Sequence, residues 1–199
     1  ADILTFTGGV TATAPSGVTL NGQLRTAGNT VSLGDAGTPV TLAGTTSIID
    51  TTNNGGTAAG GDITLGGAVD GTAGNSQSLT LNAGTGGLIG ATSTIGTGTS
   101  LKTLTVTNSG GASFTGAVTT GTSVVLTDTT DATNITFTGA LTTPTLTTAA
   151  QGYNLDVLGG GTSITNAVTF ANTGTLQLGN AAADILTFTG GVTATAPSG

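Results

Sequence analysis

Apolar and polar residues alternate with a period of two along most of this chain, in short runs. Leu4 and Phe6 alternate with Thr5 and Thr7, and the alternation resumes after the glycine pair at 8–9. A period of two is typical of β-strands, whose successive side chains point to opposite faces. Glycine, proline, asparagine or aspartate ends each run after about 3–5 residues, as expected at corners. Comparable runs lie at 10–14, 18–20, 31–33, 40–42, 63–65, 79–81, 104–106, 124–126, 135–137, 168–170 and 176–178.

No segment keeps an apolar period of 3.6 residues, and glutamate, a good helix former, is absent. The sequence therefore predicts an all-β protein without helices. Short strands suit a parallel β-helix, or β-solenoid, in which each strand pairs with the equivalent strands of neighbouring coils. Coils of about 20 residues predict roughly nine to ten coils. The alternative is a tandem set of Ig-like sandwiches, against which the chain has no tryptophan and no long regular strands.

The opening segment ADILTFTGGVTATAPSG, residues 1–17, returns letter for letter as residues 183–199. Identity over so long a period is typical of a tandem array. We expect residues 1–182 to form one full solenoid repeat and residues 183–199 to begin the next, with no separate domain. The two copies should then share one face, related by a translation along the axis and a modest twist. The alternatives are a designed overlap and two copies of a terminal pairing segment.

A shorter motif, Phe-Thr-Gly, occurs at Phe6, Phe114, Phe137 and Phe188. Alternating apolar neighbours indicate that these rings, and that of Phe170, are structural core residues rather than ligand platforms. We expect the Phe6-type residues to stack in one inward-facing column. The stretch 50–61, DTTNNGGTAAGG, has no strand pattern and is expected to be a looped-out corner.

Charge limits the partners that this chain can bind. It carries 9 acidic residues, all aspartate, and 2 basic ones, for a net charge of −7. With no basic patch to displace counterions, nucleic acid is not an expected partner, and the acidic balance disfavours anionic membranes. Mutual repulsion would instead keep long assemblies soluble. No apolar run approaches the roughly 18 residues of a membrane-spanning helix.

Few side chains are available for catalysis, because histidine, cysteine and glutamate are all absent. Their absence excludes the Ser-His-Asp triad, thiol nucleophiles, glutamate acid/base pairs and ordinary zinc sites. A two-aspartate hydrolase or lyase would rely on Asp128 and Asp131 with Arg25 or Lys102. Such sites usually carry aromatic sugar platforms, and Tyr153 is the only aromatic residue other than phenylalanine. We therefore expect no enzymatic activity.

Two further patterns are candidates for ligand binding. Asp128, Asp131 and Asn134 could hold calcium, which prefers several oxygen ligands, and no other cofactor is expected. Their spacing matches neither an EF-hand nor a glycine-rich calcium repeat, so a corner capped by aspartate and asparagine side chains is favoured. Thr-X-Thr pairs such as Thr103 and Thr105 suggest ice binding, although outward threonine is also the ordinary polar residue of a strand.

Three segments carry a family resemblance: GDITLGGAVDG at 61–71, SLTLNAGTG at 78–86 and LKTLTV at 101–106. They resemble the giant β-strand-repeat surface proteins of Gram-negative bacteria, which are similar to filamentous-haemagglutinin-type adhesins. The resemblance implies an exported, right-handed parallel β-helix that forms a fibre or stalk at the cell surface. No segment of this chain matches the secretion domain or the adhesive tip of that family.

These patterns predict a structural repeat unit of an extracellular cell-surface filament, sheath or giant adhesin stalk, acting by coil-on-coil β stacking. Its expected partner is itself, through tandem or head-to-tail stacking, with lateral bundling as a further contact. The alternative is a surface-binding module on the same scaffold, with carbohydrate, a host surface or ice as ligand.

Overall fold

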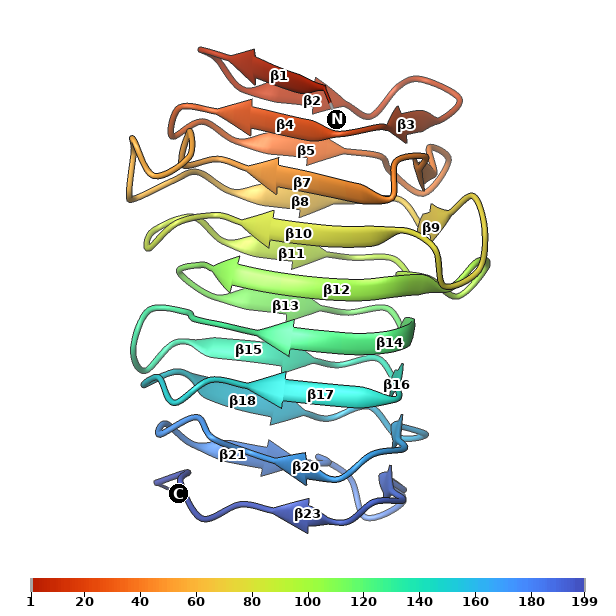
Figure 1. The fold of residues 1–199 in the computed structure, drawn as a ribbon, viewed down its shortest axis with the longest axis vertical. Coiled ribbons are helices and arrows are strands. Elements are labelled where there is room, and N and C mark those ends of the chain that lie inside the picture. The colour runs from red at the N-terminus through yellow and green to blue at the C-terminus, as the bar shows by residue number, and fades with distance from the viewer. Residues whose placement is uncertain (1, 199) are drawn as a thin grey trace.

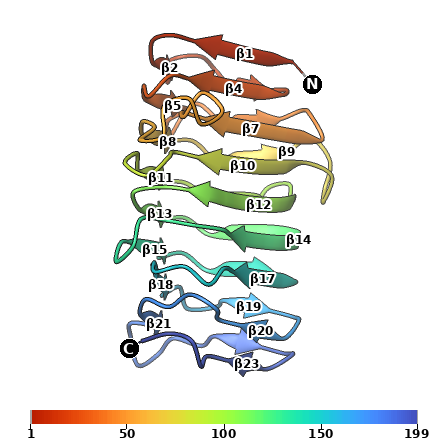
Figure 2. The ribbon, with the colours of Figure 1, turned by 60° about the vertical axis from the view of Figure 1, so that its left-hand side comes forward.

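The computed structural model describes residues 2–198 and is a β-solenoid in which all pairs of named strands run parallel. Figure 1 shows the coils stacked along the long axis, with the two chain ends at opposite ends of the stack. The turned view in Figure 2 shows the same stacking from a second direction. Each coil passes through three strand positions, which we name face one, face two and face three in chain order. The prediction of an all-β solenoid is confirmed, and residues 2–198 contain no helix.

Face two forms one continuous sheet of eight strands, one for each coil. The coil number is therefore eight rather than the predicted nine to ten. Unequal coil length explains the difference: the coil from Ile135 to its partner Leu155 is short, but the coil from Val31 to its partner Ile63 also contains the segment 51–61. The strands of face two are β2 (Val10–Ala12), β5 (Val31–Leu33), β8 (Ile63–Leu65), β11 (Ile89–Ala91), β13 (Ala112–Phe114), β15 (Asn134–Phe137), β18 (Asn154–Val157) and β21 (Leu176–Leu178).

Face one carries the longest strands, and one of them, β14, begins on face three and continues around the corner. Its strands are β1 (Ile3–Phe6), β4 (Gln23–Thr26), β7 (Thr46–Asp50), β10 (Ser78–Asn82), β12 (Leu101–Asn108), the second half of β14 (Val118–Leu126), β17 (Thr145–Thr148) and, as a separate pair that continues beyond β17, β20 (Val168–Thr169) and β23 (Val192–Thr193).

Face three has the shortest pairings and is bridged at one coil by a single residue. Ile95 forms parallel bridges to Val69 above and Val118 below. β14 begins on this face, where it pairs with β16, and continues onto face one, where it pairs with β17. The strands of face three are β3 (Val18–Leu20), β6 (Val40–Leu42), β9 (Val69–Gly71), the start of β14, β16 (Leu141–Thr143), β19 (Ser163–Ile164) and β22 (Thr187–Phe188).

The core consists of apolar columns that run along the axis. Parallel pairing in register places every inward residue of one coil over the inward residue of the next. On face two, Val31, Ile63, Ile89, Ala112 and Ile135 form one such column, and none of them is more than 4% exposed. Burial of these side chains and the interstrand hydrogen bonds therefore stabilise the stack together.

The prediction that the Phe6-type residues form a single column is wrong. Phe114 and Phe137 stack on face two with ring centroids 4.8 Å apart, and both are fully buried. Phe6, however, lies on face one in the first coil, and Phe188 lies on face three. Only the interval from Phe114 to its register partner Phe137 makes one whole coil. The other intervals between motifs are not whole numbers of coils, so the rings fall on different faces.

The expected same-face placement of the two identical segments is also wrong. The first copy supplies β1 to face one and β2 to face two, whereas the second copy supplies β22 to face three and β23 to face one. Both copies keep the local order of strand, glycine pair and strand. From β1 to β22 the chain advances 23 faces, which is seven coils and two faces. The offset between the two copies is thus one face short of eight coils.

Candidate functional site

At the two ends of the solenoid, inward-facing side chains are exposed, whereas the equivalent side chains of the inner coils are buried. In β1 the inward-facing Leu4 and Phe6 are 48% and 40% exposed, whereas their neighbour Leu24 in the next coil is 6% exposed. At the opposite end Leu178 and Val192 are 42% and 44% exposed. An apolar edge of parallel strands is a template for strand addition, and covering it removes this surface from water. The ends are therefore the first candidate for a functional surface.

A single carboxylate organises the corner between β7 and β8. The sequence predicted a looped-out corner at 50–61, and in the structure Asp50 ends β7 and the corner spans 51–61. Asp50 is 5% exposed, and its Oδ1 accepts hydrogen bonds from the backbone N–H and the hydroxyl of Thr52 at 2.9 and 2.6 Å. Its Oδ2 accepts the Asn54 N–H at 2.7 Å and lies 3.9 Å from Nε of Arg25. Asn82, in the coil below, donates to Oδ1 at 3.2 Å. The corner is thus tied to the coils on both sides of it.

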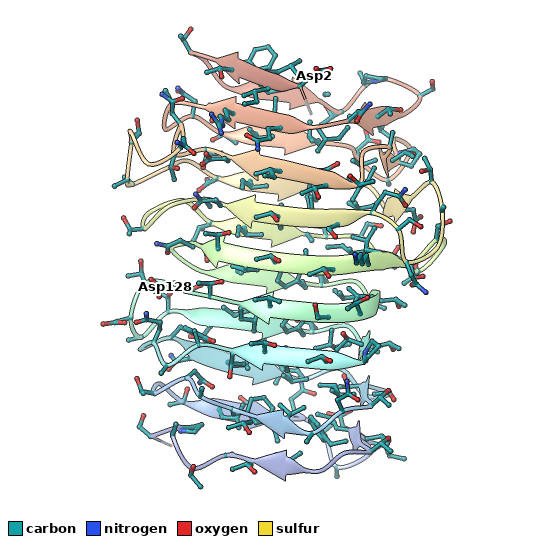
Figure 3. The ribbon with its side chains drawn as sticks, viewed as in Figure 1. Asp2 and Asp128 are labelled. Atoms are coloured by element: carbon teal, nitrogen blue, oxygen red, sulfur yellow. The ribbon has the colours of Figure 1, made fainter. Side chains whose placement is uncertain are left out.

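A shallow groove of about 380 Å³ lies against this corner and the coils below it. Its polar lining comes from successive coils, and Asn82 is the register partner of Asn108. Figure 3 shows Asp128 at this edge of the solenoid and Asp2 at the N-terminal end. The lining includes Thr52, Asn82, Thr85, Asn108, Asp128 and Gln151.

The three calcium candidates hold separate structural positions. Asp128 Oδ1 accepts the N–H of Thr129 at 2.8 Å, which is the geometry of a capped corner. Asn134 lies at the start of β15, where it donates to Asp156 at 2.6 Å and accepts from Asn154 at 3.1 Å. Asp131 lies beside Gly152. Within residues 2–198 no group of three or more aspartates could hold a metal ion.

The residues named for two-aspartate catalysis are also spread along the axis. Arg25 lies on β4 in the second coil, beside Asp50, whereas Asp128 follows β14 in the sixth coil. Lys102 lies exposed on β12. Tyr153 is fully buried, so its ring offers no platform for a sugar.

Face one carries a double column of outward-facing positions, nearly all of them hydroxyl residues, over four successive coils. Each coil contributes two outward positions separated by one inward residue, and parallel pairing aligns them along the axis. The Thr103/Thr105 pair is visible in the sequence, but unequal coil lengths conceal the pairs that lie above and below it. The aligned positions are Ser78 and Thr80, Thr103 and Thr105, Ser123 and Val125, and Thr145 and Thr147.

Tyr153 is the one buried group with a strongly shifted titration among the described residues. Its hydroxyl accepts the N–H of Ala149 at 3.2 Å and donates to the carbonyl of Leu126 at 3.4 Å. Burial raises the pKa of the Tyr153 phenol to about 12. Burial favours the neutral phenol over the charged phenolate. The contribution of Tyr153 to the stability of the fold is therefore complete below the unfolded pKa of about 10 and is lost as the pH rises through the pKa of the folded state.

We therefore expect the absorbance of tyrosinate in the folded chain to titrate with a midpoint near pH 12. The chain contains one tyrosine and no tryptophan, so the signal reports this residue alone. In concentrated guanidinium chloride the midpoint should return to about 10, the value of an exposed phenol. A native midpoint near 10 would place the phenol in water and contradict the packing described above.

Comparison of the chain with protein-family models, curated protein sequences and solved structures gives no match. Among residues 2–198 no helix is long and apolar enough to cross a membrane. The solenoid, its open apolar ends and its outward faces are therefore the features that bear on function.

Proposed function

We propose that this chain is a structural repeat unit of an extracellular filament, sheath or adhesin stalk at the cell surface. The observation that carries the proposal is the pair of open apolar ends, with Leu4 and Phe6 at one end and Leu178 and Val192 at the other. Each end lacks a covering coil among the described residues. Continuation of the same coil stacking, within one long chain or between chains, would bury both.

Strand direction favours head-to-tail growth over a closed dimer. Because all named strand pairs are parallel, the N-terminal end of one solenoid continues the pattern at the C-terminal end of another. Such a contact joins two different surfaces, and a contact of this kind produces an open filament unless its rotation closes a ring. The geometry therefore supports a linear assembly.

Composition supports a mechanical role rather than a catalytic one. The chain has no cysteine, histidine or glutamate and a net charge of −7. Like charges distributed along the axis oppose uncontrolled lateral aggregation of a long fibre. The resemblance of segments 61–71, 78–86 and 101–106 to giant surface repeats points to a location outside the cell.

Electron microscopy of the purified chain tests this proposal. We expect filaments one solenoid wide whose length grows with protein concentration. Replacing Leu4 by lysine should abolish them, because a charge would point into the interface between stacked coils. The matched control is Thr5→Lys, which adds the same charge on the outward side of the same strand and should leave filaments intact. A monomeric parent chain, or filaments indifferent to Leu4→Lys, would contradict the proposal.

The double hydroxyl column of face one favours a second candidate, a binding surface for ice or carbohydrate. Hydroxyl groups aligned on a parallel sheet offer donors and acceptors at a spacing of about 4.8 Å along the axis. Thermal hysteresis that disappears on Thr105→Lys would support ice as the ligand. No hysteresis and no binding to a glycan panel would exclude this candidate while leaving the filament untouched.

A further inference from the structure

We propose that consecutive repeats follow one another with a rotation of one third of a turn about the solenoid axis. A given face of the repeat would then point in the same direction again only after three repeats. This inference depends on the proposed function, because it concerns repeats that stack into one continuous solenoid. It assigns to residues 183–199 the role of a rotated junction with a second copy of the repeat.

The first observation is the face that each copy of the repeated segment occupies. In the first copy Ile3–Phe6 pairs on face one, and in the second copy Phe188, the equivalent of Phe6, pairs with Ile164 on face three. Val10 pairs with Val31 on face two, whereas its equivalent Val192 pairs with Val168 on face one. Both strands of the second copy have therefore moved back by one face.

The second observation is that this rotation keeps the inward side chains inward. Phe188 lies over the fully buried Ile164 and meets the buried ring of Phe170 edge to face, with centroids 6.2 Å apart. Leu186 is partly buried against the same core. The rotated copy is thus packed as a coil of the solenoid rather than laid against its outside.

The third observation concerns the backbone-to-backbone hydrogen bonds of the first copy, which join it to the following coil. The carbonyl of Asp2 accepts the N–H of Gln23 at 2.8 Å, and the N–H of Val10 donates to the carbonyl of Thr30 at 2.9 Å. The carbonyl of Ala12 accepts the next such bond, from Gly34, at 2.9 Å. These positions in the segment are all even-numbered.

The second copy makes its contacts with the preceding coil, and its strand hydrogen bonds use backbone groups at other positions of the segment. The carbonyl of Ile185 accepts the N–H of Gly161 at 2.9 Å, and the N–H of Thr187 donates to Thr162 at 2.8 Å. The carbonyl of Thr193 accepts the N–H of Phe170 at 2.8 Å.

These three groups correspond to positions 3, 5 and 11 of the segment, all odd-numbered. None of these six backbone groups forms a hydrogen bond in both copies. The two sets of hydrogen bonds are therefore compatible with each other. One segment could pair above as the second copy does and below as the first copy does. Together the two copies describe both sides of a complete junction between repeats.

The rotation sets the dimensions of the assembly. One repeat advances 23 faces, or seven coils and two faces, so three repeats make 23 whole coils. At about 4.8 Å per coil, one repeat rises about 37 Å and three repeats about 110 Å. The hydroxyl columns and the corner at 51–61 would appear on three sides of the fibre in turn. Such a fibre would offer the same surface to neighbours or ligands all around its circumference.

Spin-label distances test the junction in the chain as it is, because it contains no cysteine of its own. Thr105 and Ser113 lie outward in the same coil, on faces one and two respectively. We expect a label at Thr193→Cys to be closer to Thr105→Cys than to Ser113→Cys. The control is Thr11→Cys, the equivalent position in the first copy and about the same axial distance away, which should be closer to Ser113→Cys. If both labels were closer to Ser113→Cys, the copies would share face two and the inference would be overturned.

Cryo-electron microscopy of a chain that carries the repeat three times extends the test to the array. We expect a continuous solenoid in which successive 51–61 corners project a third of a turn apart. A continuous solenoid whose corners all project on one side would overturn the rotation and leave the proposed filament standing. Separate, unstacked units would overturn the proposed function itself.

Discussion

Replacing Phe137 by alanine is expected to lower the free energy of unfolding by about 3–5 kcal/mol, which is the cost of removing a fully buried phenylalanine. The ring is fully buried in the core, and it stacks on Phe114 with centroids 4.8 Å apart and planes 11° apart. Truncation would leave a cavity in the column of face two and would also remove the aromatic contact. Equilibrium urea denaturation followed by circular dichroism would measure the change.

Phe6 is the matched control, since it belongs to the same Phe-Thr-Gly motif. It lies in the first coil and is 40% exposed, so Phe6→Ala should cost less than about 1 kcal/mol in the isolated chain. Equal losses at both positions would show that the motif, rather than its place in the stack, decides burial. A small loss at Phe137 would contradict the column of face two.

Replacing Gly139 by alanine is expected to destabilise the chain by about 1–3 kcal/mol, because three glycines stack at the corner between face two and face three. A Cβ on Gly139 would overlap the backbone of Gly116 and Ala117 in the coil above. A Cβ on Gly159 would overlap Gly139 in the same way. The obstacle is main chain, which can move only by separating the coils. The urea midpoint of Gly139→Ala should therefore fall.

Gly90→Ala provides the comparison within the same solenoid. Gly90 lies outward on β11, where an added Cβ meets no atom within 4 Å and the backbone has no positive φ. Alanine at this position should leave stability unchanged or raise it by about 0.4–1 kcal/mol through the lower entropy of the unfolded chain. If both substitutions cost the same, close approach of the coils would not be the reason for glycine at position 139.

Individual strands were predictable where an apolar-polar-apolar triplet lies between two corner signals. The runs at 18–20, 31–33, 40–42, 63–65 and 176–178 coincide with β3, β5, β6, β8 and β21. Two strands, β4 and β11, carry no such signal. β4 has the sequence QLRT, and β11 has glycine at its centre. Their neighbours in the stack, and not their own residues, determine that they are strands.

The surfaces of functional interest could be predicted only in part. Threonine pairs such as Thr103/Thr105 were visible, because two outward positions on one strand are two residues apart. Their alignment with Ser78 and Thr145 depends on the lengths of several intervening corners. Asp128 and Asn134 are close in sequence, yet one caps a corner and the other belongs to a polar ladder on face two.

The repeated segment at 1–17 and 183–199 also shows which properties the local sequence determines and which the tertiary structure decides. Its alternating residues and its glycine pair specify strand, corner and strand locally, and both copies take that form. These properties depend on sterics and side-chain direction within a few residues, so the order of the residues is enough to determine them. The face on which each copy lies depends instead on every coil between them, including the looped-out corner at 51–61. The number of faces between the two copies is therefore not a local property, and it is fixed only when the strands pair in register. For this reason the second copy is rotated by one face, although the sequence predicted a translation.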